Sequence, residues 1–213
     1  MYLIGCAGTM SMAKLPERII ITDDPLRARV LVSHHLEFSR LLRENGDFFV
    51  FDGSYKSTPL SVVSTGYGKD NLPESLNLLK QLGAIKILYL STCVSTTSRY
   101  DIKSLILGAG GSKKMTGLAL DTAKQQEIAI YLETIGTQGV GFSSIDFSSD
   151  ISSPYILNDV IAMLYDYASA NDIEALALLT VSENTTTGAK MEENEAKSRL
   201  YPASALAFEI MAL

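Results

Sequence analysis

Residues 60–95, LSVVSTGYGKDNLPESLNLLKQLGAIKILYLSTCVS, are the segment that decides the fold. Their pattern predicts a short apolar strand, a glycine turn, a helix and a second strand over Ile85–Leu90. Pro73 and Glu74 suit the first turn of that helix, where a missing N–H is harmless and a carboxylate meets the positive end of the helix dipole. Ligands bind open α/β sheets beyond the carboxyl ends of the strands, so the hydroxyl-rich Ser91–Cys93 marks a candidate site.

Strands and helices alternate along the rest of the chain, which predicts a mostly parallel or mixed sheet covered on both faces. The other predicted strands are Ile19–Ile21, Phe48–Asp52, Ser54–Lys56, Leu60–Ser64, Ser104–Leu107, Val140–Phe147 and Ala175–Val181. The other predicted helices begin near Pro25 and cover Thr122–Gly136, Ile156–Ala170 and Met191–Leu213, with Pro202 as a point of breakage. Gly108–Gly111 lacks the spacing and the following helix of a phosphate-binding motif, and it is interpreted as a loop. We expect a single domain over residues 1–213.

The composition excludes several partners. The 213 residues are 46% hydrophobic and 20% charged, and the net charge is −6 with a pI near 5.0. An acidic chain is poorly suited to nucleic-acid backbones or anionic membrane surfaces. No apolar run reaches the length that spans a membrane. We therefore expect a small-molecule ligand, with no nucleic acid and no membrane.

Cysteine and histidine usage indicates neither a disulfide framework nor a metal site. Cys6 and Cys93 lie far apart and form no CxxC pair, and the adjacent His34 and His35 lack metal-ligand spacing. Buried, reduced cysteines in a cytoplasmic protein are the expected outcome.

The stretch from Asp23 to Arg29 joins a strand to a helix. A strand, an acidic cap and a helix with an early arginine form an anion-handling geometry in many α/β proteins. Asp23 and Asp24 would oppose a bound anion unless Arg27 and Arg29 outweigh them. The alternative is a plain helix cap followed by solvated arginines.

Five stretches, in the same order and spacing, resemble the nucleoside phosphorylase family, which includes the purine nucleoside phosphorylases and the uridine phosphorylases. They are Asp23–Ala28 (DDPLRA), Phe51–Lys56 (FDGSYK), Ser64–Gly68 (STGYG), Leu88–Cys93 (LYLSTC) and Ala175–Glu183 (ALALLTVSE). The resemblance covers about Ile19 to Glu183. It implies a three-layer α/β/α sandwich around a central mixed, partly closed sheet.

The resemblance implies orthophosphate as co-substrate, no cofactor and no metal, with a phosphate site at Arg27, Thr92 and Asp23. This chain departs from the family at two of its positions. Asp23 replaces the first glycine of the phosphate loop, and Tyr89 replaces an arginine of the central strand. A negative charge is gained where phosphate would lie, and a positive charge is lost.

The resemblance also implies positions for the base and the sugar. Glu183 stands where purine-specific members carry an aspartate that protonates the departing base, and a glutamate is a competent general acid. Phe147 (or Phe142), Cys93 and Ser182 are the predicted base-binding residues. Asp159 and Asn158 are the predicted ribose-binding residues, with a helix-start cap as the alternative.

The function implied is cleavage of the N-glycosidic bond of a purine nucleoside with phosphate, giving free base and sugar 1-phosphate, as in purine salvage. Two alternatives stay open. One is a catalytically impaired relative that binds a nucleobase or nucleoside, or serves as a structural oligomer partner. The other is a nucleoside hydrolase. Relatives form a dimer or trimer of dimers, so we expect a homo-oligomer. Arg43 is a candidate for a residue donated across the interface, with a solvated helix end as the alternative.

Overall fold

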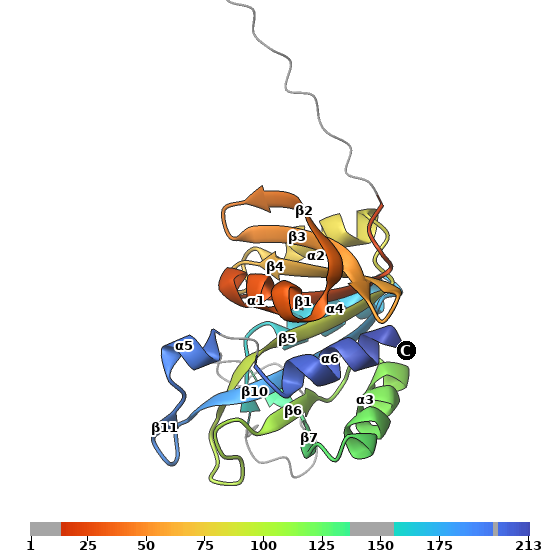
Figure 1. Ribbon diagram of the computed structural model, residues 1–213. Helices are drawn as coiled ribbons and strands as arrows, with labels where there is room; N and C mark the ends of the chain where they lie inside the picture. Colours follow the sequence, from red (N-terminus) through yellow and green to blue (C-terminus); the bar gives the residue numbers. More distant parts are fainter. Residues whose placement is uncertain (1–13, 137–155, 198–199) are drawn as a thin grey trace, which may run out of the picture.

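The computed structural model describes residues 14–136, 156–197 and 200–213, which form helices packed around a central sheet (Figure 1). Its strands are β1 (Arg18–Thr22), β2 (Glu37–Asn45), β3 (Phe48–Tyr55), β4 (Thr58–Thr65), β5 (Lys86–Ser95), β6 (Leu105–Gly108), β7 (Ile130–Glu133), β8 (Ile135–Gly136), β9 (Ile156–Leu157), β10 (Glu174–Asn184) and β11 (Ala189–Lys190). Its helices are α1 (Pro25–His35), α2 (Leu72–Gln81), α3 (Lys113–Gln125), α4 (Ile161–Ala170), α5 (Glu193–Ala196) and α6 (Ala203–Ala212).

The main path of the sheet runs β2-β3-β4-β1-β5-β10-β6-β7. β1 is parallel to β4 and β5, and β10 is parallel to β5, whereas β2, β3 and β4 form an antiparallel meander. The sheet is therefore mixed, and the carboxyl ends of β4, β1, β5 and β10 lie at one edge. Ligand sites of α/β proteins are found at this edge.

Helices cover both faces of the sheet. On one face, α1, α3 and α6 bury residues such as Leu31, Ala119 and Phe208 in a single core cluster. On the other face, α2 and α4 bury residues such as Leu76 and Leu164 in a second cluster. The predicted three-layer α/β/α sandwich with a mixed sheet is confirmed.

Burial on both faces explains the composition of the central strands. Ile19, Ile20 and Ile21 of β1 are all 0% exposed, although successive side chains point to opposite faces. A strand with helices on each side has no solvent face, so it reads as a continuous apolar run rather than an alternating one.

Several predicted boundaries are wrong. Gly53 lies inside β3 and does not divide it, and β5 continues to Ser95, so Ser91–Cys93 belongs to the strand. The helix predicted over Thr122–Gly136 instead covers Lys113–Gln125. Its buried face is Met115, Ala119 and Ala123 at four-residue spacing, and the Ser112 hydroxyl caps it by accepting from the Met115 N–H.

The glycines of residues 108–111 make room for an aromatic ring. A helix, α3, does follow them, contrary to the sequence prediction. A Cβ on Gly108 would lie 2.9 Å from the Tyr165 hydroxyl oxygen, and one on Gly111 would lie 2.6 Å from the carbonyl oxygen of Ala175. Tyr165 donates to the Gly108 carbonyl at 2.8 Å. These glycines therefore serve packing against α4 and β10.

Three further segments differ from their predictions. The segment 156–170 is divided into β9 and α4, and the segment 191–213 contains two helices, α5 and α6, with a cis peptide bond before Pro202. β2 was not predicted, and Arg43 lies on this strand, not at a helix end. The strand predicted over Val140–Phe147 lies outside the described residues.

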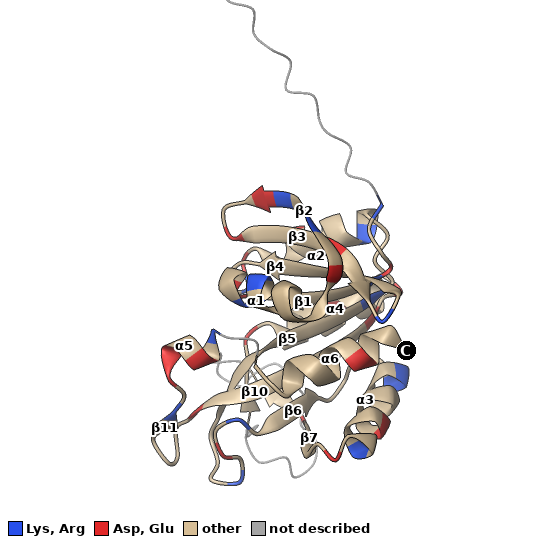
Figure 2. Ribbon diagram, viewed as in Figure 1, with Lys and Arg blue, Asp and Glu red and all other residues tan. Residues whose placement is uncertain are grey.

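Charges of both signs are interspersed over the described elements (Figure 2).

Within the described ranges, no helix is long and apolar enough to cross a bilayer.

Candidate functional site

Arg27 is held at the carboxyl end of β1 by the way α1 begins. The Asp24 carboxylate accepts from the backbone N–H of Leu26 at 2.8 Å and of Arg27 at 3.1 Å, which caps the helix. Pro25 follows at the first helical position, where its missing N–H costs nothing. The first turn of α1 therefore starts directly at the sheet edge.

The Arg27 guanidinium is buried among oxygen acceptors. Its Nη1 donates to the Thr22 hydroxyl at 2.9 Å and to Asp23 Oδ1 at 2.7 Å. Its Nη2 donates to the carbonyl oxygen of Ala196 in α5 at 2.8 Å. The Ser91 hydroxyl donates to the same Asp23 oxygen at 2.8 Å. Asp23 thus supplies a negative charge to Arg27 from within the chain.

One donor of this guanidinium is left over. Arg27 Nε is buried and has no hydrogen-bond partner among the described residues. A buried N–H without an acceptor is costly, so this position favours an added oxygen.

The two arginines of α1 have different environments. Arg27 is 3% exposed, so the solvated-arginine alternative is wrong for it. Arg29 is exposed, pairs with Glu44 at 3.2 Å and lies over the Phe49 ring at 4.3 Å from its centroid. Only Arg27 faces the sheet edge.

Thr92 and Tyr89 point to opposite faces of β5. Thr92 pairs in register with Thr180 of β10, whose hydroxyl is buried without a partner among the described residues. Tyr89 is 0% exposed in the core cluster beneath α2 and α4. Burial raises the pKa of Tyr89, so its side chain stays neutral, and its buried hydroxyl has no hydrogen-bond partner among the described residues.

The predicted acid Glu183 lies at the far side of the same edge. β10 is irregular between Val181 and Glu183, and the Glu183 carboxylate pairs with Lys190 of β11 at 3.2 Å. Ser182 donates to the carbonyl oxygen of Cys93 at 3.3 Å. Neighbouring strands lie about 4.8 Å apart, so β1 and β10, on either side of β5, are about 10 Å apart.

Cys93 offers little to a ligand through its side chain. The thiol is free and buried, and burial raises its pKa. Its carbonyl oxygen already accepts from Ser182. Phe147 and Phe142, the predicted stacking residues, lie outside the described residues.

The Asn158 side chain is engaged within the protein. It donates from Nδ2 to the carbonyl oxygen of Thr92 at 3.0 Å and accepts at Oδ1 from the Val160 N–H at 2.9 Å. This is a side-chain turn that precedes α4, whose N-cap residue is Val160 and which has no side-chain cap. Asp159 beside it is exposed. Ribose binding by either residue stays a prediction.

The structure adds residues that the sequence prediction missed. Thr22 contacts Arg27, and the Ala196 carbonyl reaches Arg27 from a segment 169 positions away. Ser91, from the predicted Ser91–Cys93 stretch, donates to Asp23. Tyr67 in the glycine turn is a further neighbour. Partial burial, its hydrogen bond to Asp24 and the charge of Asp23 raise its pKa to about 12. Ala196 had no signal in the sequence, because only its backbone carbonyl takes part.

Within the described ranges, no group of three or more His, Cys, Asp or Glu side chains is arranged to hold a metal ion.

Comparison with known proteins gives a consistent result. No protein-family model matches the chain. A curated DeoD-type purine nucleoside phosphorylase of Alkaliphilus metalliredigens is 24% identical over 92% of this chain and 95% of its own length. One from Oceanobacillus iheyensis is 25% identical, covering 87% and 88% of the two chains, and one from Chromobacterium violaceum is 26% identical, covering 81% and 83%.

A solved structure matches the fold over nearly the whole chain. It is a purine nucleoside phosphorylase from Toxoplasma gondii in complex with immucillin-H, with a TM-score of 0.80 and 16% identity over 93% of this chain and 91% of that one. The resemblance seen in the sequence is confirmed, and the chain is a divergent relative of the nucleoside phosphorylases that has their fold.

Proposed function

We propose that this protein binds a purine nucleoside across the carboxyl ends of β1, β5 and β10 and breaks its N-glycosidic bond, with orthophosphate as the acceptor. The products would be free base and sugar 1-phosphate. The observation that carries the proposal is the buried Arg27 guanidinium at one side of this edge and the Glu183 carboxyl group at the other. The curated relatives, all named as purine nucleoside phosphorylases, support the reaction class.

In the proposed reaction, Arg27 and Thr92 hold phosphate while one of its oxygens attacks C1′ of the sugar. The C1′–N bond breaks, and Glu183 donates a proton to the departing base nitrogen. Arg27 Nε, buried without a partner among the described residues, is the donor that a phosphate oxygen would satisfy. Glu183 must carry a proton to act, so the nucleoside has to weaken its pairing with Lys190.

Asp23 limits phosphate binding in this scheme. Two unit charges about 4 Å apart repel by roughly 4 kcal/mol at an effective dielectric constant of 20. Phosphate must therefore displace the Asp23 carboxylate from Arg27, or bind weakly beside it.

The Asp23–Arg27 ion pair favours a second candidate function. With the cation already neutralised at 2.7 Å, the protein could cleave nucleosides with water or bind a nucleobase or nucleoside without cleaving it. In the hydrolytic case, water would attack C1′ and pass its proton to Asp23, whose side chain is 25% exposed, while the C1′–N bond breaks and Glu183 protonates the departing base.

Base release from inosine, adenosine and uridine, measured with and without orthophosphate, tests these candidates. Release that requires phosphate supports phosphorolysis, and release unchanged without phosphate supports hydrolysis. No release from any nucleoside, together with a thermal shift on adding free bases, would leave the binding function alone. A preference for inosine or adenosine over uridine is expected.

We also propose that the protein works in the cytoplasm as a homo-oligomer, a dimer or trimer of dimers. The free, buried thiol of Cys93 fits a reducing compartment. Light scattering tests the assembly, and a monomer at working concentration contradicts it.

A further inference from the structure

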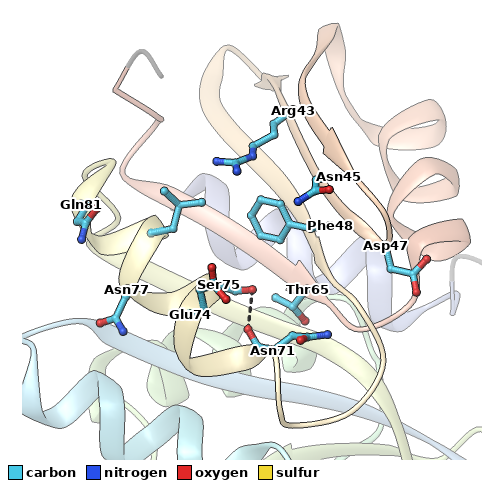
Figure 3. Close-up of a pocket in the computed structure, with 11 residues that line it drawn as sticks. Arg43, Asn45, Asp47, Phe48, Thr65, Asn71, Glu74, Ser75, Asn77 and Gln81 are labelled. Atoms are coloured by element: carbon cyan, nitrogen blue, oxygen red, sulfur yellow. Dashed lines mark hydrogen bonds between the residues drawn. The ribbon is translucent and has the colours of Figure 1, made fainter. Parts of the chain in front are cut away.

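A cavity of about 480 Å³ lies between the β2–β3 hairpin and helix α2 (Figure 3). Its volume is within the roughly 300–1,000 Å³ typical of small-molecule sites. Residues of β2, β3, α2 and the end of β4 line it, whereas the nucleoside is proposed to bind at β1, β5 and β10. An inference about this cavity therefore does not depend on the proposed function.

The floor of the cavity is built by the glycine turn after β4. Gly66 has φ +76°, and a Cβ on it would lie 3.3 Å from the Asp47 Cβ and 3.5 Å from the Asn71 Nδ2. The turn thus brings the β2–β3 connection and the start of α2 together without a side chain between them. Asn71 does not use its side chain to cap α2, so its amide group is not tied to the helix end.

Apolar surface comes from both sides of the cavity. Phe48 on β3 is half-buried, and Figure 3 shows its ring among the residues that line the cavity. Leu78 lines it from α2 and is also half-buried. Covering these two side chains removes apolar surface from water, so the cavity favours a ligand with an apolar part.

Charges of opposite sign come from the two elements that face each other across the cavity. Arg43 belongs to β2, and its guanidinium lies 5.8 Å from the centre of the Phe48 ring. Glu74 is an exposed residue in the first turn of α2. A guanidinium recognises a carboxylate, whereas a carboxylate only accepts hydrogen bonds and so pairs with an ammonium group. The cavity therefore offers one partner for an anion and one for a cation.

This combination of charges disfavours simpler ligands. Asp47 adds a second carboxylate to the lining, so a purely anionic ligand meets net repulsion. A simple amine makes no use of Arg43, and an uncharged apolar ligand makes no use of either charge. The amide groups of Asn45 and Asn71 are further donors for a ligand carboxylate. A zwitterion with an apolar side chain matches all of these groups.

We propose that this cavity binds a free amino acid with an apolar side chain, such as leucine. Its carboxylate accepts from the Arg43 guanidinium, and its ammonium group donates to Glu74. Its side chain lies against Phe48 and Leu78.

Calorimetric titration with L-leucine, without nucleoside or phosphate, tests the site. We expect a dissociation constant below about 1 mM. N-acetyl-L-leucine lacks the ammonium group and L-leucinamide lacks the carboxylate, and each should bind about tenfold more weakly or worse, because each loses one charged partner. Equal binding of all three compounds overturns the proposal, and this comparison needs no variant.

Substitutions test the two charged residues directly. Arg43→Gln and Glu74→Gln should each weaken leucine binding about tenfold or more. Arg40→Gln and Glu37→Gln are the matched controls, because both residues are exposed on β2 and do not line the cavity, and they should leave binding unchanged.

Three results would overturn the proposal. The first is leucine binding that is the same in wild type, Arg43→Gln and Glu74→Gln. The second is the absence of leucine binding up to about 10 mM. The third is a crystal structure in which a second copy of the chain fills the cavity.

Discussion

Asp23 Oδ1 lies 2.7 Å from Arg27 Nη1, and the same oxygen accepts from the Ser91 hydroxyl, so the chain places its own carboxylate on its buried guanidinium. Charge-assisted hydrogen bonds of this kind are strong, so an external anion has to compete with Asp23 for this guanidinium. This relationship leads to the first two predictions.

Asp23→Asn should strengthen orthophosphate binding. The change removes the negative charge but keeps the shape and a hydrogen-bonding oxygen, and we expect about a tenfold or larger gain in affinity, since tenfold corresponds to about 1.4 kcal/mol. Calorimetric titration with phosphate measures it. Asp121→Asn, at an exposed position of α3, is the matched control. Equal affinities in wild type and both variants would show that Asp23 does not compete with phosphate.

Arg27→Ala should destabilise the fold. It leaves Asp23 and the Ala196 carbonyl without their partner, and removing one member of a buried ion pair costs about 3–5 kcal/mol. Urea unfolding of Arg27→Ala, of Asp23→Ala and of the double variant Asp23→Ala/Arg27→Ala gives the coupling free energy between the two side chains. The free energy of unfolding should fall less in the double variant than the sum of the decreases in the two single variants. Strictly additive decreases would contradict a direct interaction.

Glu183→Gln should lower base release by about 10²- to 10⁴-fold, because the amide cannot donate the acid proton. Its effect on the free energy of unfolding should stay below about 1 kcal/mol, since the ion pair with Lys190 is largely exposed. Lys190→Gln breaks the same ion pair and keeps the acid. If Lys190→Gln reduces base release as strongly as Glu183→Gln, the ion pair and not the proton is what matters.

Glu209 should make stability depend on pH. Burial acts to raise its pKa, but hydrogen bonds from Lys56 and Tyr55 outweigh this and lower it. A carboxyl group whose pKa is lowered by folding stabilises the fold at pH values above its unfolded-state pKa of about 4.3. This stabilisation is lost as the pH falls through the folded-state pKa. Glu209→Gln should therefore lower the free energy of unfolding by up to about 1 kcal/mol at pH 7 and leave it unchanged at about pH 2. Chemical unfolding at both pH values tests this, with Glu37→Gln as the exposed control. An equal cost at both values contradicts it.

Gly111→Ala and Gly117→Ala should change stability in opposite directions. A Cβ on Gly111 meets the Ala175 carbonyl oxygen at 2.6 Å and Tyr165 at 3.0 Å, so we expect a loss of about 1–3 kcal/mol. A Cβ on Gly117, inside α3, has nothing within 4 Å, and alanine there should add about 0.5–1 kcal/mol. Thermal unfolding of both variants provides the comparison. A stabilising Gly111→Ala would remove the packing explanation for residues 108–111.

The sequence by itself determined the alternation of strands and helices, because apolar runs such as Ile19–Ile21 and Ala175–Val181 follow from burial on both faces of a sheet. It also indicated that Asp23 and Arg27 lie where a strand passes into a helix, and it predicted the glycine turn at Gly66–Gly68, since capping and turn chemistry are local. It misplaced the helix at Lys113–Gln125, where a Ser112 cap and a sparse apolar face were overlooked beside the stronger apolar run that follows.

Only the tertiary structure decided what these residues do together. The pairing of β1 with β5 brings Ser91 to Asp23, and the return of the chain at α5 brings the Ala196 carbonyl to Arg27. Neither contact leaves a mark in sequence spacing, because each joins segments more than 60 positions apart. Whether Arg27 is open to an anion or already neutralised is therefore a property of the folded sheet edge.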